Sequence, residues 1–277
     1  MVDILSGLGM RLLAFGFSTP YSYISMMRNY RTKEEAYNIL SEVGKDIAAG
    51  KVPPRLGPLI FVFTGTGNVS QGAQEALCVL PHEYVKVEDL PKVAQTGTTT
   101  KVYLCVVDPE HHMVDKQTGK ACEGYKAFLA DPAKYKSLFS EKIAPYTSVL
   151  INGIVWQPNH PRLIAKTDVH SLFKPLDRAH KKGFGRLPHR LLAVCDISAD
   201  PGGSVEFIDY CTTIDRPFFI YNATTDKDGK IVEETKTDCF DVPTGILVNS
   251  VDNMPAEMPI EATNTFGDLL TPFVDEI

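Results

Sequence analysis

The stretch Leu59-Ile-Phe-Val-Phe-Thr-Gly-Thr-Gly-Asn-Val-Ser-Gln-Gly-Ala73 decides the fold of this chain of 277 residues. Its start, residues 59–63, is a run of apolar side chains with β-branched and aromatic members, which predicts a short buried strand. After two glycines, apolar residues recur at helical spacing, at Val69, Ala73, Leu77 and Leu80. The stretch therefore predicts a strand, a glycine turn and an amphipathic helix in immediate succession.

The turn has the pattern G-x-G-x-x-S-x-G, which runs from Gly65 to Gly72. Gly65 permits a tight turn, and Gly67 has no side chain to keep a phosphate away from the N–H groups at the start of the helix, which include those of Asn68 and Val69. Ser70 stands where the dinucleotide fingerprint has its third glycine; serine is small enough for close helix packing, and its hydroxyl is suited to donate to a phosphate. Strand-to-helix turns without a ligand also contain glycines, but the flanking strand and helix favour nucleotide binding.

Composition excludes several classes of protein. The formal net charge of −6 opposes general binding to nucleic acid or to an anionic membrane surface. No apolar run approaches the roughly 20 residues that cross a bilayer. The 6 cysteines form no C-x-x-C pair, which predicts reduced thiols and no metal site.

Two helices are predicted before the organising strand, one over residues 4–15 and one over residues 32–47, where Thr32 is a suitable N-cap. A dinucleotide fold rarely begins with helices alone. We therefore predict that residues 1–57 are a helical linker to a missing N-terminal lobe, and that residues 58–277 form the dinucleotide-binding domain.

A second strand is predicted over residues 82–89, after the first helix of that domain. Dinucleotide folds place an acidic residue about 20 positions past the glycines, on the ribose 2′-hydroxyl, and Glu88 lies at that distance. Lys86 is close by and would suit a 2′-phosphate. The choice between NAD and NADP stays open at this stage.

Residues 101–107 form a third apolar run, and Met113-Val114 is expected to turn back on it as a hairpin, after a turn at Asp108-Pro109. His111 and His112 are interpreted as part of a solvated turn, because neighbouring strand residues point to opposite faces and rarely share a metal ion. Residues 131–139, with a proline at the first helical position, predict a surface helix.

Polar side chains end two further predicted strands. Asn152 and Gly153 lie in the strand of residues 146–156, and Asp196 ends the strand that begins at Leu191. Ligands of open α/β sheets bind beyond the carboxyl ends of the strands, so we interpret Asp196 as a ligand contact. Asn152 is equally compatible with a structural role in the interior.

The remaining segments complete an α/β pattern. Residues 218–222 and 245–249 predict strands, residues 226–230 a hairpin turn, and residues 259–277 a closing amphipathic helix. Residues 177–188 are expected to be the least structured. The predicted fold class is α/β, a Rossmann-like doubly wound and mainly parallel sheet with helices on both faces, preceded by the linking helical segment.

Read together, the glycine turn, Ile151-Asn-Gly-Ile-Val-Trp156 and Cys195-Asp-Ile-Ser-Ala-Asp200 closely resemble the lysine-ketoglutarate reductase part of the bifunctional α-aminoadipic semialdehyde synthases. Residues 251–262 and Phe266-Gly-Asp fit the same family, so the resemblance spans nearly the whole chain. The resemblance implies an enzyme that condenses L-lysine with 2-oxoglutarate and reduces the imine with NADPH to saccharopine, in lysine degradation. It also implies two Rossmann-like lobes, as in alanine dehydrogenase and transhydrogenase, of which this chain is the nucleotide-binding one.

The residues that the resemblance assigns to the cofactor lie in three segments. They are Gly65, Gly67, Asn68, Val69, Ser70 and Gly72 in the phosphate turn, Asn152, Gly153 and Ile154 at one strand end, and Asp196, Ile197, Ser198 and Ala199 at the next, near the nicotinamide. The acid–base pair of related saccharopine dehydrogenases belongs to the amino-terminal lobe. We therefore assign no catalytic residue within the chain.

The resemblance also implies partners and a compartment. The partners are the missing N-terminal lobe and the saccharopine dehydrogenase part of the same polypeptide; a homo-oligomer is left open. Animal relatives are mitochondrial and plant relatives cytosolic. Two alternatives stand beside the reductase: a catalytically inactive dinucleotide-binding or regulatory module, and another Rossmann enzyme, such as one that binds S-adenosylmethionine.

Overall fold

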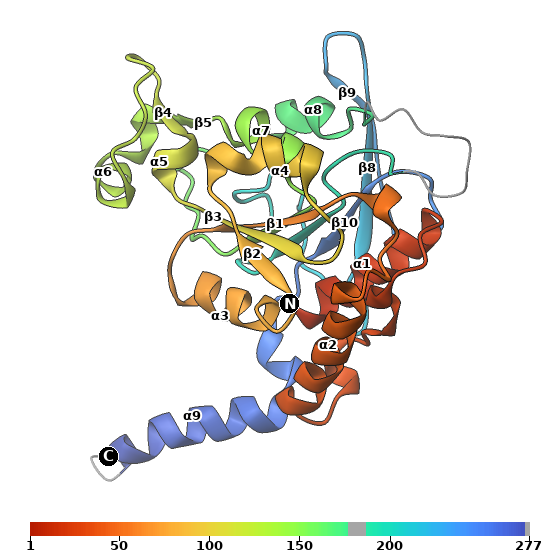
Figure 1. Cartoon of the computed structure of the whole chain (residues 1–277). Helices are drawn as coiled ribbons and strands as arrows, with labels where there is room; N and C mark the ends of the chain where they lie inside the picture. The colour runs from red at the N-terminus through yellow and green to blue at the C-terminus, as the bar shows by residue number, and fades with distance from the viewer. Residues whose placement is uncertain (177–186, 275–277) are drawn as a thin grey trace.

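The computed structural model of the chain describes residues 1–176 and 187–274 and shows an α/β fold (Figure 1). Its centre is an 8-stranded sheet in the order β2-β3-β1-β6-β7-β10-β8-β9. The strands from β2 to β10 in this order run parallel, whereas β8 and β9 are antiparallel to their neighbours. The predicted fold class, a mainly parallel sheet covered by helices, is confirmed.

The strands of the main sheet are β1 (Leu59–Thr64), β2 (His82–Tyr84), β3 (Val102–Val107), β6 (Val149–Asn152), β7 (Ala193–Asp196), β8 (Phe219–Thr225), β9 (Ile231–Thr237) and β10 (Ile246–Asn249). The helices are α1 (Val2–Ala14), α2 (Lys33–Ala48), α3 (Asn68–Leu77), α4 (Leu90–Thr96), α5 (Pro109–His112), α6 (Tyr125–Ala130), α7 (Phe139–Lys142), α8 (Val169–Leu172) and α9 (Pro259–Val274). Strands β4 (Met113–Asp115) and β5 (Tyr135–Ser137) form a separate small sheet.

Alternate residues of β1 face two different hydrophobic layers, as the two-residue period of a strand requires. Phe61 and Phe63 pack in the layer that contains α1, α2 and α3. Ile60 and Val62 pack in the layer that contains Leu90, at the start of α4, together with residues of α7 and α8. Every residue of β1 is buried, which is why its sequence is continuously apolar.

Helix α1 packs against the main sheet. Its apolar residues belong to the same core as β1 and β10. The guanidinium of Arg11 is fully buried and donates to the carbonyl oxygens of Val242 (2.9 Å) and Thr244 (3.1 Å), just before β10. Burial lowers the pKa of Arg11 to about 10. The boundary at residue 57 and the linking role of this segment stay predictions.

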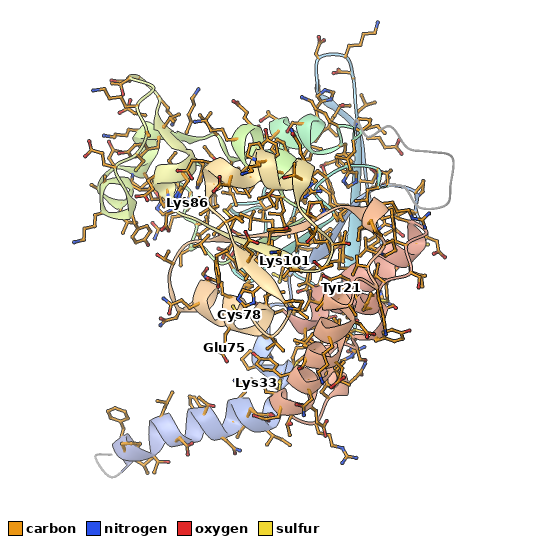
Figure 2. All side chains as sticks on the ribbon, viewed as in Figure 1. Tyr21, Lys33, Glu75, Cys78, Lys86 and Lys101 are labelled. Atoms are coloured by element: carbon orange, nitrogen blue, oxygen red, sulfur yellow. The ribbon has the colours of Figure 1, made fainter. Side chains whose placement is uncertain are left out.

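Helix α2 begins as the sequence indicates. The N–H of Glu35 donates to the side-chain oxygen of Thr32 at 3.2 Å, which is the predicted N-cap. Lys33 reaches Glu75 on α3, with 3.4 Å between Nζ and Oε1 (Figure 2). Both side chains are more than half exposed, so this ion pair adds little to stability.

Two local predictions are wrong. Residues 131–139 do not form one helix but a 3-10 turn, strand β5 and the start of α7. Met113-Val114 does not pair with the strand of residues 101–107; it lies in β4 and pairs with β5. In both cases the residues pack in a small hydrophobic cluster of Met113, Cys122, Phe128 and Tyr135, which are distant in sequence, and not with their neighbours along the chain.

The C-terminal helix α9 projects away from the body of the molecule (Figure 1). None of its residues is buried, and it exposes a set of large apolar side chains: Ile260, Phe266, Leu269, Leu270, Phe273 and Val274. The predicted helix over residues 259–277 is therefore present as far as Val274, but its apolar side chains are exposed. Most of the segment 177–188, predicted to be the least structured, lies outside them.

Within the described part of the chain, no helix is both long and apolar enough to span a bilayer.

Candidate functional site

A cavity of about 420 Å³ opens at the carboxyl edge of the sheet, where parallel α/β sheets bind ligands. One side is formed by the glycine turn, residues 64–69, and the other by the segment 153–156. Residues 107–109 at the end of β3 and apolar side chains of α6 complete the wall. Most of the lining is apolar with a few polar groups, as in small-molecule sites.

The two glycines of the turn differ in backbone conformation. Gly65 has a φ of 76°, a left-handed conformation that favours glycine. Gly67 has a φ of −74° and a ψ of 179°, which any residue can adopt, and a Cβ placed there would meet no atom within 4 Å. Neither the backbone nor the packing requires a glycine at Gly67. The absent side chain leaves open space directly at the N-terminus of α3.

The N–H groups at the start of α3 are available to a ligand. The turn is exposed, and no acceptor within the described residues takes the N–H of Asn68 or Val69. The side chain of Gln71 donates to the carbonyl oxygen of Thr66 at 2.8 Å and holds the turn in place. Free N–H groups and the helix dipole favour an anion at this position.

Ser70 and Gly72 lie apart from the cavity. Ser70 is 3% exposed, and its hydroxyl accepts a hydrogen bond from the side chain of Gln74 at 3.0 Å. It therefore serves close helix packing, one of the two roles considered for it. Gly72 is on the exposed side of α3 and does not line the cavity.

Val69 was predicted to face the core, and this is wrong. It is 47% exposed and lines the cavity, whereas Ala73, Leu77 and Leu80 are buried as predicted. A Cβ at Gly153 would lie 2.9 Å from Cγ1 of Val69, so that glycine allows β6 and α3 to approach closely. Gly153 and Ile154 both line the cavity.

Asn152 joins three strand ends below the cavity. Its side-chain oxygen accepts from the hydroxyl of Thr64 at 3.0 Å, at the end of β1. Its side-chain nitrogen lies 2.8 Å from Oδ1 of Asp196 and 2.8 Å from Oγ of Ser204. Asn152 is fully buried, and protein groups satisfy the hydrogen-bonding atoms of its side chain. Of the two roles that the sequence left open for Asn152, the structure favours the structural one.

The strand end after β7 supports this network. Asp196 is 1% exposed, and burial raises the pKa of its carboxyl. Ser198 donates to Asp196 at 2.6 Å, and the N–H of Ile197 donates to the carbonyl oxygen of Asn152 at 2.8 Å. Ala199 has a φ of 51°, a strained conformation of the kind that gathers at functional sites. These residues lie beside the cavity, not in its wall.

Glu88 lies away from the cavity, in a 3-10 turn (Val87–Asp89) that follows a strand shorter than predicted. Strand β1 lies between β3 and β6, and on the side of β2 its neighbour is β3, which comes later in the chain than β2. The acidic residue at its carboxyl end is Asp108, and Asp108 lines the cavity. An apolar strand that ends in an aspartate was the available signal in the sequence, but Asp108 was read as part of a turn.

His112 is a second lining residue that the sequence analysis missed. It is 4% exposed, so its assignment to a solvated turn is wrong. Burial lowers the pKa of His112 to about 4, and its Nδ1 lies 3.1 Å from the hydroxyl of Ser137. The ring is therefore neutral at physiological pH. Over the described residues, no group of three or more His, Cys, Asp or Glu side chains is arranged to hold a metal ion.

Comparison with known proteins finds relatives that match the whole length of this chain. The chain is 45% identical, over its whole length, to mitochondrial alpha-aminoadipic semialdehyde synthase of Mus musculus and 46% identical to that of Bos taurus. The alpha-aminoadipic semialdehyde synthase of Arabidopsis thaliana is 37% identical, again over the whole chain. The chain is homologous to a part of the alpha-aminoadipic semialdehyde synthases.

The match to these synthases covers all of this chain but only 29% of each mammalian relative and 25% of the plant relative. The relatives are thus more than three times as long as the segment that is matched. The mammalian relatives are named as mitochondrial. No family model matches the chain.

Proposed function

We propose that the chain is the nucleotide-binding lobe of a lysine-ketoglutarate reductase, which condenses L-lysine with 2-oxoglutarate and reduces the imine to saccharopine. A reduced nicotinamide dinucleotide, NADPH in the family that the chain resembles, would supply the hydride. The observation that carries this proposal is the identity to the synthases across the whole chain, together with the exposed glycine turn.

The described residues fit a dinucleotide. The N–H groups of Asn68 and Val69 would hold the diphosphate, and the open space at Gly67 allows it to approach. Gly153 and Ile154 would position the nicotinamide half at the next strand end. Positioning and exclusion of water are the contributions that a protein makes to hydride transfer.

We assign no acid–base residue within the chain. His112 is neutral, with its Nδ1 3.1 Å from the hydroxyl of Ser137, and the family resemblance places the acid–base pair in the other lobe. We therefore expect the 277-residue chain alone to be inactive and the complete polypeptide to be active. By analogy with the mammalian relatives we place the protein in mitochondria, and in the cytosol if it is of the plant type.

The test is an assay of the complete polypeptide. Oxidation of the reduced cofactor, followed at its absorbance band, should require lysine and 2-oxoglutarate together. Activity with either substrate alone would contradict the reaction. Cofactor binding without any activity in the complete polypeptide would favour the alternative, a catalytically inactive dinucleotide-binding or regulatory module.

A further inference from the structure

We propose that Asp108 makes the site selective for NAD(H) over NADP(H), by accepting the 2′-hydroxyl of the adenosine ribose and repelling a 2′-phosphate. This inference rests on the proposed function only in that the cavity binds a nicotinamide dinucleotide. It departs from the NADP preference that the family resemblance implies.

The first support is the position of Asp108 in the sheet. Strand β3 pairs in parallel with β1 along its whole length, from Leu59 opposite Val102 to Thr64 opposite Val107. Asp108 is the next residue after β3, so it lies directly beside the glycine turn, at the carboxyl edge of the sheet. In doubly wound folds the acidic residue that holds the ribose 2′-hydroxyl ends the strand next to the first one.

The second support is strand order. Counting about 20 residues from the glycines assumes that the next strand in the chain is the neighbour of β1. Here the next strand, β2, takes the edge of the sheet, and β3 lies between β2 and β1. Glu88 follows the edge strand, one strand further from the glycine turn, and does not line the cavity.

The third support is charge. Asp108 is the carboxylate of the cavity wall, and the described residues that line the wall include neither lysine nor arginine. Burial raises the pKa of Asp108, His111 lowers it, and Glu110 raises it by the smallest of these three effects. A 2′-phosphate would meet the carboxylate of Asp108, whereas a 2′-hydroxyl can donate to it.

The backbone at Asp108 is held in place. Its N–H donates to Nδ1 of His111 at 3.0 Å, and the residue is the N-cap of α5. Replacement by serine or asparagine keeps a residue that caps helices well while removing the negative charge. These variants therefore test the charge without disturbing the turn.

The experiment is a fluorescence titration of the 277-residue chain with NADH and with NADPH. The wild type should bind NADH at least about tenfold more tightly than NADPH, and Asp108→Ser should reduce this ratio by at least about tenfold. Asp108→Asn serves as a second neutral variant in case the serine variant fails to fold. Glu88→Gln is the matched control, because it removes a carboxylate outside the cavity, and its ratio should equal that of the wild type.

Each other outcome has a defined meaning. Equal or tighter binding of NADPH by the wild type, or an unchanged ratio in both neutral variants, would overturn the role of Asp108 while leaving dinucleotide binding intact. A change of the ratio in Glu88→Gln alone would transfer the role to Glu88. Binding of neither cofactor by a folded chain would reject the proposed function, and this inference with it.

Discussion

The backbone N–H of Gly65 donates a hydrogen bond of 2.8 Å to the carbonyl oxygen of Val107. This bond extends the pairing of β1 and β3 by one residue and connects the glycine turn to the residue before Asp108. The expected phosphate site and the expected ribose site are therefore fixed to one another by the backbone. Their relative position does not depend on flexible side chains.

A side chain at Gly67 should block ligand binding without unfolding the protein. We expect Gly67→Val to weaken binding of reduced cofactor at least about tenfold, because it fills the space above the start of α3. The loss in unfolding free energy should stay within about 1 kcal/mol, since valine is a poorer N-cap than glycine. Fluorescence titration and urea unfolding measure the two effects. Gly67→Thr, with the same shape and a better cap, should block binding with less loss of stability, and full affinity in either variant would refute the phosphate site.

The glycine pattern of the sequence and the structure give different expectations for Gly72. Because Gly72 lies on the exposed side of α3, Gly72→Ala should leave cofactor affinity unchanged. It should raise the unfolding free energy by about 0.5–1 kcal/mol, the usual gain when alanine replaces glycine within a helix. Urea denaturation checks the gain. A clear loss of affinity would instead place Gly72 in the phosphate turn.

Removal of the Asn152 side chain should destabilise the whole sheet edge. In Asn152→Ala the groups of Thr64 and Asp196 lose a buried partner, so we expect a loss of about 2–4 kcal/mol in unfolding free energy. Chemical denaturation is the measurement. Asn29→Ala, at an exposed asparagine, should change stability by less than about 0.5 kcal/mol. Weaker cofactor binding with unchanged stability would show that Asn152 is a direct ligand contact.

Two buried histidines should make the fold sensitive to acid. Burial lowers the pKa of both His112 and His189 to about 4, below the ordinary value of about 6.5. Between these values the unfolded chain binds protons that the folded chain does not, so unfolding free energy is lost as the pH falls through this window. The loss should be on the order of 3 kcal/mol for each histidine by pH 4.

The measurement is urea unfolding at a series of pH values. His112→Gln removes one of the two titrating groups and should flatten the curve between about pH 6.5 and pH 4. An exposed histidine provides the control, and His82→Gln should leave the slope as in the wild type. An identical slope in His112→Gln and the wild type would contradict the assignment.

Helix α9 should contribute little to the stability of the sheet domain. Truncation after Thr263 removes residues of which none is buried within the described chain, so the Tm should change by no more than a few degrees. Removal of the exposed apolar side chains should also raise solubility. Thermal unfolding and sedimentation velocity check both effects. A large fall in Tm would show that α9 is packed in solution, and a smaller sedimenting species would show that it supports a homo-oligomer.

Local patterns in the sequence determined the elements whose signals lie within a few residues. The structure contains, as predicted, the apolar strand β1, the glycine turn and the cap at Thr32. Each of these features depends on the identity of a few consecutive residues, so it can be recognised in the sequence. The polar ends of β6 and β7 were also recognised, and the structure brings them together through Asn152 and Asp196.

Tertiary structure alone decided which strand lies beside β1. Strand order depends on which crossovers pack best across the whole sheet. The sequences of β2 and β3 therefore do not by themselves indicate which of the two strands pairs with β1. That order moved the acidic residue of the cavity from Glu88 to Asp108. It also decided that Val69 faces a cavity, that His112 is buried, and that the apolar side chains of α9 are exposed, because burial is a property of what packs against a residue and not of the residue itself.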